Sequence, residues 1–203
     1  MKIVTICLCL MLLNGCTSEP LNVRYYLLHT PEIKVSNTNE KTKPIIVLQL
    51  LDVADYLRQS SLVMQVNQHE LHYSRQDVWA EKLQSSFYKA LLQDLNSTDQ
   101  QNYVASSSPM AKHATAAITI KLEHFHATDA STVVSSGQYW LSKNDPQTGK
   151  TNKNSHLVTS THSFFFESPL KQDGYAHAVE QLRTSVFSLS QQIEKDIAAL
   201  PNK

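Results

Sequence analysis

The chain has 203 residues, with 18 basic and 18 acidic side chains, and therefore no formal net charge at pH 7. This balance excludes the basic field by which proteins attract nucleic acid, and it excludes electrostatic attachment of the body to anionic lipid. Three of the four glycines, Gly137, Gly149 and Gly174, lie far apart, which excludes the glycine-clustered motifs of dinucleotide-binding proteins, P-loop NTPases and α/β-hydrolases.

The N-terminus has the pattern of a bacterial lipoprotein signal peptide. Lys2 precedes an apolar segment, residues 3–13, which is shorter than the roughly 20 residues that span a bilayer but fits the h-region of a signal peptide. The segment ends in "LNGC", which resembles the lipobox. We therefore expect cleavage between Gly15 and Cys16, with Cys16 as the acylated first residue of the mature chain.

Cysteine usage agrees with this prediction. The chain has three cysteines, and Cys7 and Cys9 lie in the h-region, so the mature protein would keep only Cys16. A catalytic thiol, a zinc–thiolate site and a redox pair are then excluded from the mature domain. We predict no cofactor other than the acyl and diacylglycerol groups on Cys16.

Short apolar runs predict four strands in the first half of the mature chain. They cover residues 23–28, 45–51, 61–66 and 70–73. In the first of them, Val23, Tyr25 and Leu27 share one face. The second is almost continuously apolar, so we expect a central strand that is buried on both faces. The polar segment 29–44 between these two predicts a loop.

A helix is predicted after these strands. Ser74 and Asp77 fit the capping-box pattern, which satisfies free backbone N–H groups where a helix begins. Apolar residues then recur about every four residues, as on one face of a helix. They are Trp79, Leu83, Phe87 and Leu91, with Val78, Ala90 and Leu95 beside them. We expect this stripe to pack on a sheet.

Three further strands are predicted between residues 116 and 167. They cover residues 118–126, 133–141 and 156–166. In the first, the even positions from Ile118 to His126 are expected to share one face. Gly137, in the middle of the second, predicts a bulge or a close approach of backbone. The aromatic run 164–166 predicts a central strand buried on both faces, and the alternative is an exposed aromatic surface.

A second long helix is predicted at the C-terminus, with Asp173 as its N-cap. Its apolar residues follow at spacings of three and four, namely Tyr175, Val179, Leu182, Val186, Leu189, Ile193 and Ile197. The order of elements predicts one α/β domain, a mixed sheet with two long helices packed on it. We divide the chain into a signal peptide over residues 1–15, a lipidated cysteine with its tether over 16–22, and this domain over 23–203.

Nine histidines make a metal site the main chemical alternative. His124 and His126 have a spacing that suits two ligands, and His162 could join them only if its strand neighbours that of His124. The stretch "HELH" at residues 69–72 lacks the second histidine of the H-E-x-x-H motif. Exposed or strand-end histidines are the simpler interpretation, so we predict no metal site and no catalytic residues.

Three motifs, in order along the chain, resemble a known family. They are "YYLL" at residues 25–28, "DYL" at 55–57 and "WAEKL" at 79–83. With the lipobox and the regular last helix, they resemble the auxiliary lipoproteins of ABC-type intermembrane transport systems, of which the paraquat-inducible PqiC-like proteins are a branch. Tyr25, Tyr26, Trp79 and Glu81 carry this signature, and we expect them to be structural.

The resemblance implies a sandwich similar to the anticodon-binding domain or the N-terminal domain of TolB. It also implies a non-enzymatic lipoprotein of the outer membrane that faces the periplasm. Thr17 agrees with this location, because it is not the aspartate that retains lipoproteins in the inner membrane.

The implied partner is a membrane-anchored protein of the MCE class, which bridges the periplasm and carries lipids. The lipoprotein would dock this partner at the outer membrane and so support membrane integrity, and a homo-oligomer is a further expectation. Tyr56, Leu57 and Arg58 are the candidate partner surface. The alternatives are a scaffold for another envelope machine, such as a secretion apparatus, and a cryptic metallohydrolase.

Overall fold

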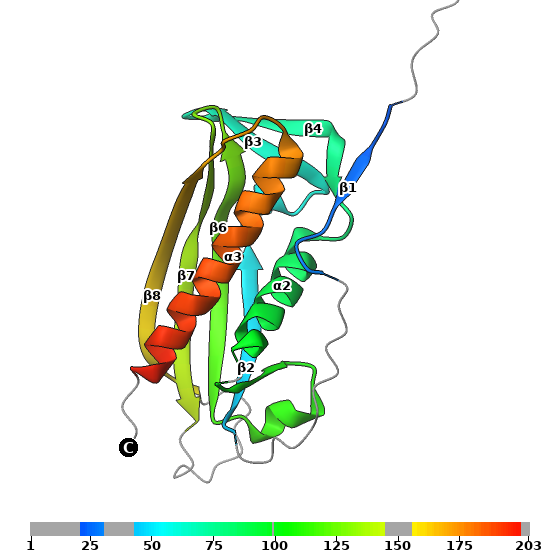
Figure 1. Ribbon diagram of the computed structural model, residues 1–203. Helices are drawn as coiled ribbons and strands as arrows, with labels where there is room; N and C mark the ends of the chain where they lie inside the picture. Colours follow the sequence, from blue (N-terminus) through cyan, green and yellow to red (C-terminus); the bar gives the residue numbers. More distant parts are fainter. Residues whose placement is uncertain (1–20, 31–42, 99, 145–155, 200–203) are drawn as a thin grey trace, which may run out of the picture.

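The computed structural model describes residues 21–30, 43–98, 100–144 and 156–199, in which one mixed sheet carries two long helices on a single face (Figure 1). The elements are β1 (Arg24–Tyr26), β2 (Ile45–Val53), the 3-10 helix η1 (Asp55–Leu57), β3 (Ser61–Asn67), β4 (Glu70–Trp79), α2 (Leu83–Ser97), β5 (Asn102–Ala105), the 3-10 helix η2 (Pro109–His113), β6 (Ala116–Thr128), β7 (Thr132–Asn144), β8 (His156–Pro169) and α3 (Tyr175–Ala198). This architecture confirms the predicted single α/β domain. The sequence did not predict β5, η1 or η2.

Strand β6 is the centre of the sheet. One of its edges is divided between two parallel strands, because β2 pairs with residues 116–122 and β3 pairs with residues 127–128. Its other edge pairs antiparallel with β7, which in turn pairs antiparallel with β8. Beyond β2 lies β5, and beyond β3 lie β4 and then β1. Within the described residues, β1, β5 and β8 are therefore the edges of the sheet.

Gly137 lies where β7 comes closest to β6. The register of the two strands shifts between Leu122 and His124, opposite Gly137, which marks a β-bulge in β6. A Cβ atom on Gly137 would lie 2.1 Å from the carbonyl oxygen of Lys121, so no side chain fits there. Of the two alternatives predicted for this glycine, the close approach is confirmed, and the bulge lies in the neighbouring strand β6.

The bulge changes which residues of β6 face the helices. Even-numbered residues of the segment 118–122 lie in the core before it, whereas Phe125 and Ala127 lie in the core after it. His124 and His126 therefore lie on the opposite face of the sheet. The prediction that the even positions share one face is wrong beyond residue 122, because the extra residue of a bulge shifts the alternation by one.

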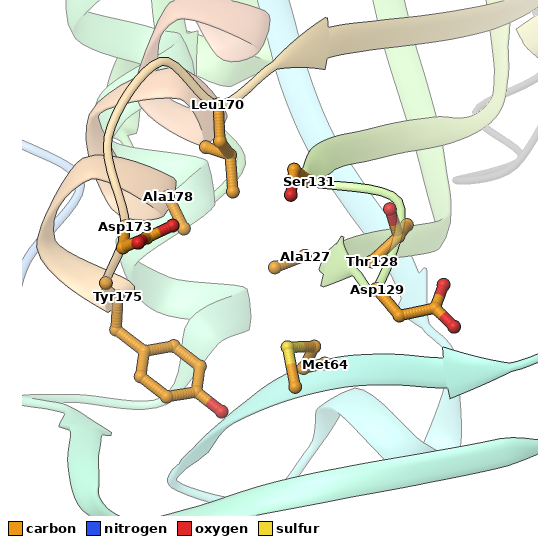
Figure 2. Close-up of a pocket in the computed structure, with 10 residues that line it drawn as sticks. Met64, Ala127, Thr128, Asp129, Ser131, Leu170, Asp173, Tyr175 and Ala178 are labelled. Atoms are coloured by element: carbon orange, nitrogen blue, oxygen red, sulfur yellow. The ribbon is translucent and has the colours of Figure 1, made fainter.

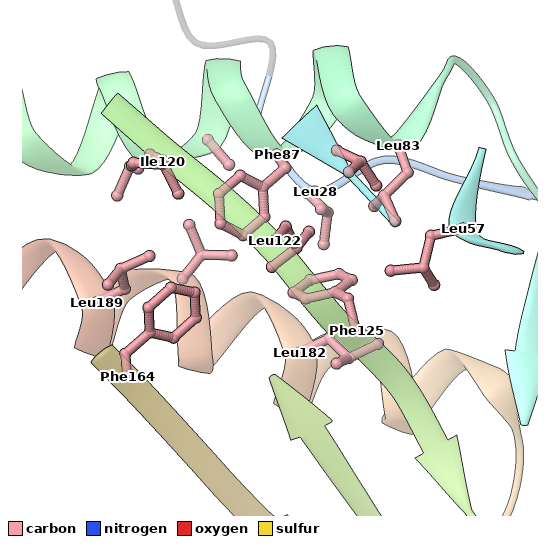
Figure 3. Close-up of a cluster of buried hydrophobic side chains, with 14 of the residues drawn as sticks. Leu28, Leu57, Leu83, Phe87, Ile120, Leu122, Phe125, Phe164, Leu182 and Leu189 are labelled. Atoms are coloured by element: carbon pink, nitrogen blue, oxygen red, sulfur yellow. The ribbon is translucent and has the colours of Figure 1, made fainter. Parts of the chain in front are cut away.

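The core fills the space between the two helices and the sheet (Figure 3). From Leu83 onward the predicted stripe of α2 is buried in it, and so is the α3 stripe except for Tyr175 and Ile197 at its ends, which are partly buried. Phe87 of α2 meets Phe125 of β6 edge to face, with ring centroids 5.6 Å apart. The N-cap of α3 is Gly174, at a φ of 105°, rather than the predicted Asp173. A positive φ is the backbone conformation that glycine adopts without strain. Within the described residues, no helix has both the length and the apolar character needed to cross a bilayer.

Helix α2 begins at Leu83, later than predicted. Ser74 and Asp77, the predicted capping box, lie instead in β4, where Asp77 donates its backbone N–H to Ser74 Oγ at 2.9 Å. The pairing of β3 with β4 skips residues 74–77. The capping pattern thus closes a bulge within a strand, and Trp79, predicted for the helix, is the last residue of β4.

Strand β8 is an edge strand, so the prediction that residues 164–166 are buried on both faces is wrong. Phe164 is 4% exposed and belongs to the core, whereas Phe165 is 66% exposed. Phe166 is partly buried against the core. The strand therefore has one buried and one open face, because the helices cover only one side of the sheet.

Replacement of Leu189 by alanine tests the packing of α3. Leu189 is 1% exposed, so Leu189→Ala is expected to lower the free energy of unfolding by about 2–5 kcal/mol. The matched control is Phe187→Ala on the same helix, where 46% exposure predicts a change within about 0.5 kcal/mol. Urea denaturation measures both, and equal losses for the two variants would contradict the assignment of the buried face.

Candidate functional site

The predicted lipid-attachment site lies outside the described residues, and so do the signal peptide and most of the tether. Gly15 and Cys16 are therefore placed only by the sequence. The first described residue, Leu21, follows Cys16 by five positions, and β1 begins three positions later at Arg24. Strand β1 is thus the described element that lies nearest, along the chain, to the predicted anchor.

A buried carboxylate fastens β1 to the domain. Asp77 of β4 is 3% exposed and accepts hydrogen bonds from the hydroxyls of Tyr26, at 2.9 Å, and Ser74, at 3.0 Å. The guanidinium of Arg24 lies 2.7 Å from the same carboxylate. Tyr26 and Arg24 both belong to β1, which also pairs in parallel with β4. Two side chains and a short backbone ladder thus hold this edge strand in place.

These contacts keep Asp77 ionised. Burial by itself would raise the pKa of the Asp77 carboxyl, because it penalises the charged form. The hydrogen bonds from Arg24, Tyr26 and Ser74 favour the charged form and outweigh burial, so the pKa lies below its ordinary value. The carboxylate is therefore charged at neutral pH and serves as a fixed structural acceptor.

The four signature residues lie around this junction in different environments. Tyr26 binds Asp77, and Trp79 is 5% exposed in the core. Glu81, between β4 and α2, pairs with Lys89 at 2.6 Å. Tyr25, by contrast, is 70% exposed and points away from the domain.

The three residues of the predicted partner surface differ in exposure. Leu57 is 2% exposed and packs in the core, so its side chain cannot contact a partner. Tyr56 is half-buried and donates its hydroxyl to the carbonyl of Glu123 at 3.0 Å, and burial raises the pKa of this hydroxyl. Arg58 is exposed and pairs with Asp52 at 2.6 Å. Of the three, only Arg58 offers a mostly exposed side chain.

The histidines of β6 do not form a metal site with His162. The rings of His124 and His126 are 5.7 Å apart, and Tyr56 lies against both. His162 is on β8, which does not pair with β6, and its ring lies 3.1 Å from Asp196 of α3. Across the described ranges, no group of three or more metal-ligating side chains is found. Burial also lowers the pKa of His126, so its ring is neutral at pH 7.

A pocket of about 380 Å³ lies between the beginning of α3 and the adjoining ends of β3 and β6 (Figure 2). Met64, Leu170 and Tyr175 supply its larger side chains, and Asp129 lies on the side opposite Leu170 and Tyr175. No histidine, cysteine, lysine or arginine is among its described lining residues. Burial raises the pKa of Tyr175, so its hydroxyl remains protonated at neutral pH. The pocket can accept an apolar group, with the carboxylates of Asp129 and Asp173 as polar groups of its lining.

Sequence reasoning missed both the Asp77 junction and the pocket. The Ser74–Asp77 pattern is visible in the sequence, but it predicted the beginning of a helix and not a bulge in a strand. The pocket had no local signal, because Met64, Ala127 and Ala178 come from three elements that lie far apart in the sequence.

Comparison with known proteins identifies the family of this chain. Residues 26–194 match the model of a family described as "ABC-type transport auxiliary lipoprotein component". The intermembrane transport lipoproteins PqiC of Escherichia coli (strain K12) and Shigella flexneri are each 24% identical over 189 residues, which is 93% of this chain and 94% of theirs.

Two crystal structures are similar in fold. An uncharacterized protein superposes with a TM-score of 0.68 at 21% identity, over 87% of this chain and 99% of that one. A protein from Xanthomonas campestris superposes with a TM-score of 0.57 at 11% identity, over 74% of this chain and 81% of the other. At these identities the similarity establishes the fold alone.

Replacement of Asp77 by asparagine tests the junction between β1 and β4. At pH 7, Asp77→Asn is expected to cost about 1–3 kcal/mol of unfolding free energy, because hydrogen bonds to a charged group are lost. The folded-state pKa of Asp77 is depressed, so its contribution is complete above the ordinary value of 3.8 and is lost as the pH falls through the folded-state pKa. The difference between wild type and variant should therefore shrink below about pH 4.

Urea denaturation of both proteins at pH 7 and pH 3 measures this change. A difference that is the same at both pH values would contradict a role for the ionised carboxylate.

Proposed function

Because the chain belongs to the family of ABC-type transport auxiliary lipoprotein components, we propose that it is a non-enzymatic accessory of intermembrane lipid transport at the bacterial outer membrane. The observation that carries this proposal is the family match over residues 26–194, a span that includes nearly every described element. The similarity to PqiC lipoproteins along 93% of the chain supports intermembrane transport as the process.

The proposed anchor is the acylated Cys16, exposed after removal of residues 1–15. A single acyl chain binds a membrane only marginally, whereas several chains together anchor a protein stably. The neutral body then needs no basic patch. Thr17, in place of an aspartate, supports the outer membrane as the destination.

The tether limits where the domain can work. Val23 follows Cys16 by seven positions, and an extended chain of that length reaches at most about 25 Å, at 3.3–3.6 Å per residue. A domain held this close to its membrane cannot carry a lipid across the periplasm by itself. It must instead receive or dock a component that arrives from the other membrane.

We infer that this component is a membrane-anchored MCE-class protein, and that the docked complex supports membrane integrity. The auxiliary character of the family supports a partner, because an auxiliary component acts with others. The exposed guanidinium of Arg58 is the proposed contact, and assembly of several copies into a collar would give the partner a closed docking surface. The alternative partner is a component of another envelope machine, such as a secretion apparatus.

Membrane fractionation of wild type and Cys16→Ser tests the anchor. We expect wild type in the outer-membrane fraction, and we expect the variant in the soluble periplasmic fraction because it cannot be acylated. Recovery of wild type in the inner membrane, or unchanged membrane attachment of the variant, would refute the proposal.

Copurification tests the partner. Wild type is expected to recover an MCE-class protein from solubilised envelopes, and Arg58→Ala is expected to recover several-fold less. The fold should be unaffected, because exposed ion pairs contribute only about 0–1 kcal/mol. Lys89→Ala is the matched control, since Lys89 is also a half-exposed, ion-paired cation. Recovery of secretion components alone would favour the alternative, and equal recovery by both variants would remove Arg58 from the contact.

A further inference from the structure

Strand β1 has one polar, attached face and one apolar, exposed face. Arg24 and Tyr26 turn toward Asp77, as described above. Tyr25 and Leu27 alternate with them and are 70% and 45% exposed. Leu21, which precedes the strand, is 57% exposed, so three of the six exposed large apolar residues in the described ranges fall within residues 21–27. Their spacing of two or four residues places them on one side of an extended segment.

This apolar face is held in a fixed position. A terminal strand normally frays unless it is tied down. Here the segment is fastened on one side by the ion pair and hydrogen bond to Asp77. At its far end Leu28 is 2% exposed in the core and donates its backbone N–H to Ser86 Oγ at 3.0 Å. The exposure of Tyr25 and Leu27 is therefore a property of the folded domain.

The place of this face in the chain favours a membrane as its contact. Leu21 follows Cys16 by only five positions, so the face begins at most about 18 Å from the acylated cysteine, at 3.3–3.6 Å per residue. Residues 21–30 include one basic side chain, Arg24, and no acidic one, so anionic lipid would not repel them. Tyrosine is enriched at membrane–water interfaces, and apolar side chains of peripheral proteins insert into the headgroup boundary.

We propose that the outward side of β1 and its flanking residues, formed by Leu21, Tyr25 and Leu27, lies in the headgroup region of the membrane that holds the anchor. This inference rests on the proposed function, because it takes acylated Cys16 as the anchor. The contact gives the domain one orientation on its membrane instead of free rotation about a tether. In Figure 1, β1 and β8 lie at opposite margins of the domain, so this orientation turns β8 away from the lipid.

Single-cysteine labelling of the lipidated, full-length protein tests the contact. After signal cleavage the only native cysteine is the acylated Cys16, so Tyr25→Cys provides one free thiol for a nitrobenzoxadiazole fluorophore. The matched control is Phe165→Cys on β8, because Tyr25 and Phe165 have nearly equal exposure, 70% and 66%. Both proteins are reconstituted in vesicles of phosphatidylethanolamine and phosphatidylglycerol that carry brominated acyl chains.

We expect the label at Tyr25→Cys to emit at shorter wavelength and to be quenched by brominated lipid several-fold more strongly than the label at Phe165→Cys. Aqueous iodide should give the reverse order. Equal quenching at the two positions by both agents would overturn the proposal. Protection from iodide without quenching by brominated lipid, if it increases with protein concentration in detergent, would show that a second copy of the chain covers β1, and this also overturns it.

The proposed anchor and the proposed β1 contact can be refuted separately. If Cys16→Ser remains attached to the membrane, the proposed anchor is refuted. If Cys16→Ser is released while the label at Tyr25→Cys remains as accessible to iodide as that at Phe165→Cys, the anchor is supported and only the β1 contact is refuted. Both labelled positions are mostly exposed, and unchanged thermal unfolding of each labelled protein confirms that its fold is intact.

Discussion

The backbone of β6 is the constraint on which the rest of the structure depends. This strand of 13 residues bonds β7 along one edge and shares its other edge between β2 and β3. The two branches of the sheet, one leading to β5 and the other to β4 and β1, meet only through it. The bulge opposite Gly137 lets the strand keep this pairing while Phe125 and Ala127 replace the even positions in the core.

Two buried carboxylates extend this framework to the helices and to the N-terminal edge. Asp94 of α2, 5% exposed, binds the Arg183 guanidinium of α3 with both oxygens, at 2.6 and 2.5 Å, and so fixes one helix against the other. Asp77 does the same for β1 with Arg24 and Tyr26. A buried carboxylate without partners would lower the stability of the folded state. Asp77 and Asp94 therefore require donor side chains in fixed positions around them. The strand nearest the predicted anchor is thereby fixed relative to the core.

Two side-chain groups of the described residues are suited to binding. The pocket beside α3 offers apolar walls, the carboxylates of Asp129 and Asp173 and a protonated Tyr175, and the Tyr56–His124–His126 group offers a neutral His126 in edge contact with Tyr56. An auxiliary component of a transport system acts through its surfaces. The exposed groups on residues 21–27 and at Arg58 are surfaces of two kinds, one apolar and one charged.

Patterns within single segments predicted the apolar stripes of α2 and α3, parts of the seven strands β1, β2, β3, β4, β6, β7 and β8, and the close approach of backbone at Gly137. The lipobox cysteine stays a prediction. The candidate site was predicted only in part, because Arg58 is exposed as a partner surface requires whereas Leu57 is buried. Three features became evident from the folded chain alone. Ser74 and Asp77 close a bulge in β4, and Phe165 lies on the open face of an edge strand. His124 and His126 lie on the face of β6 opposite the core. The reason is that strand order, bulges and the face chosen by the helices depend on hydrogen bonds between distant segments, and no pattern within one segment contains them.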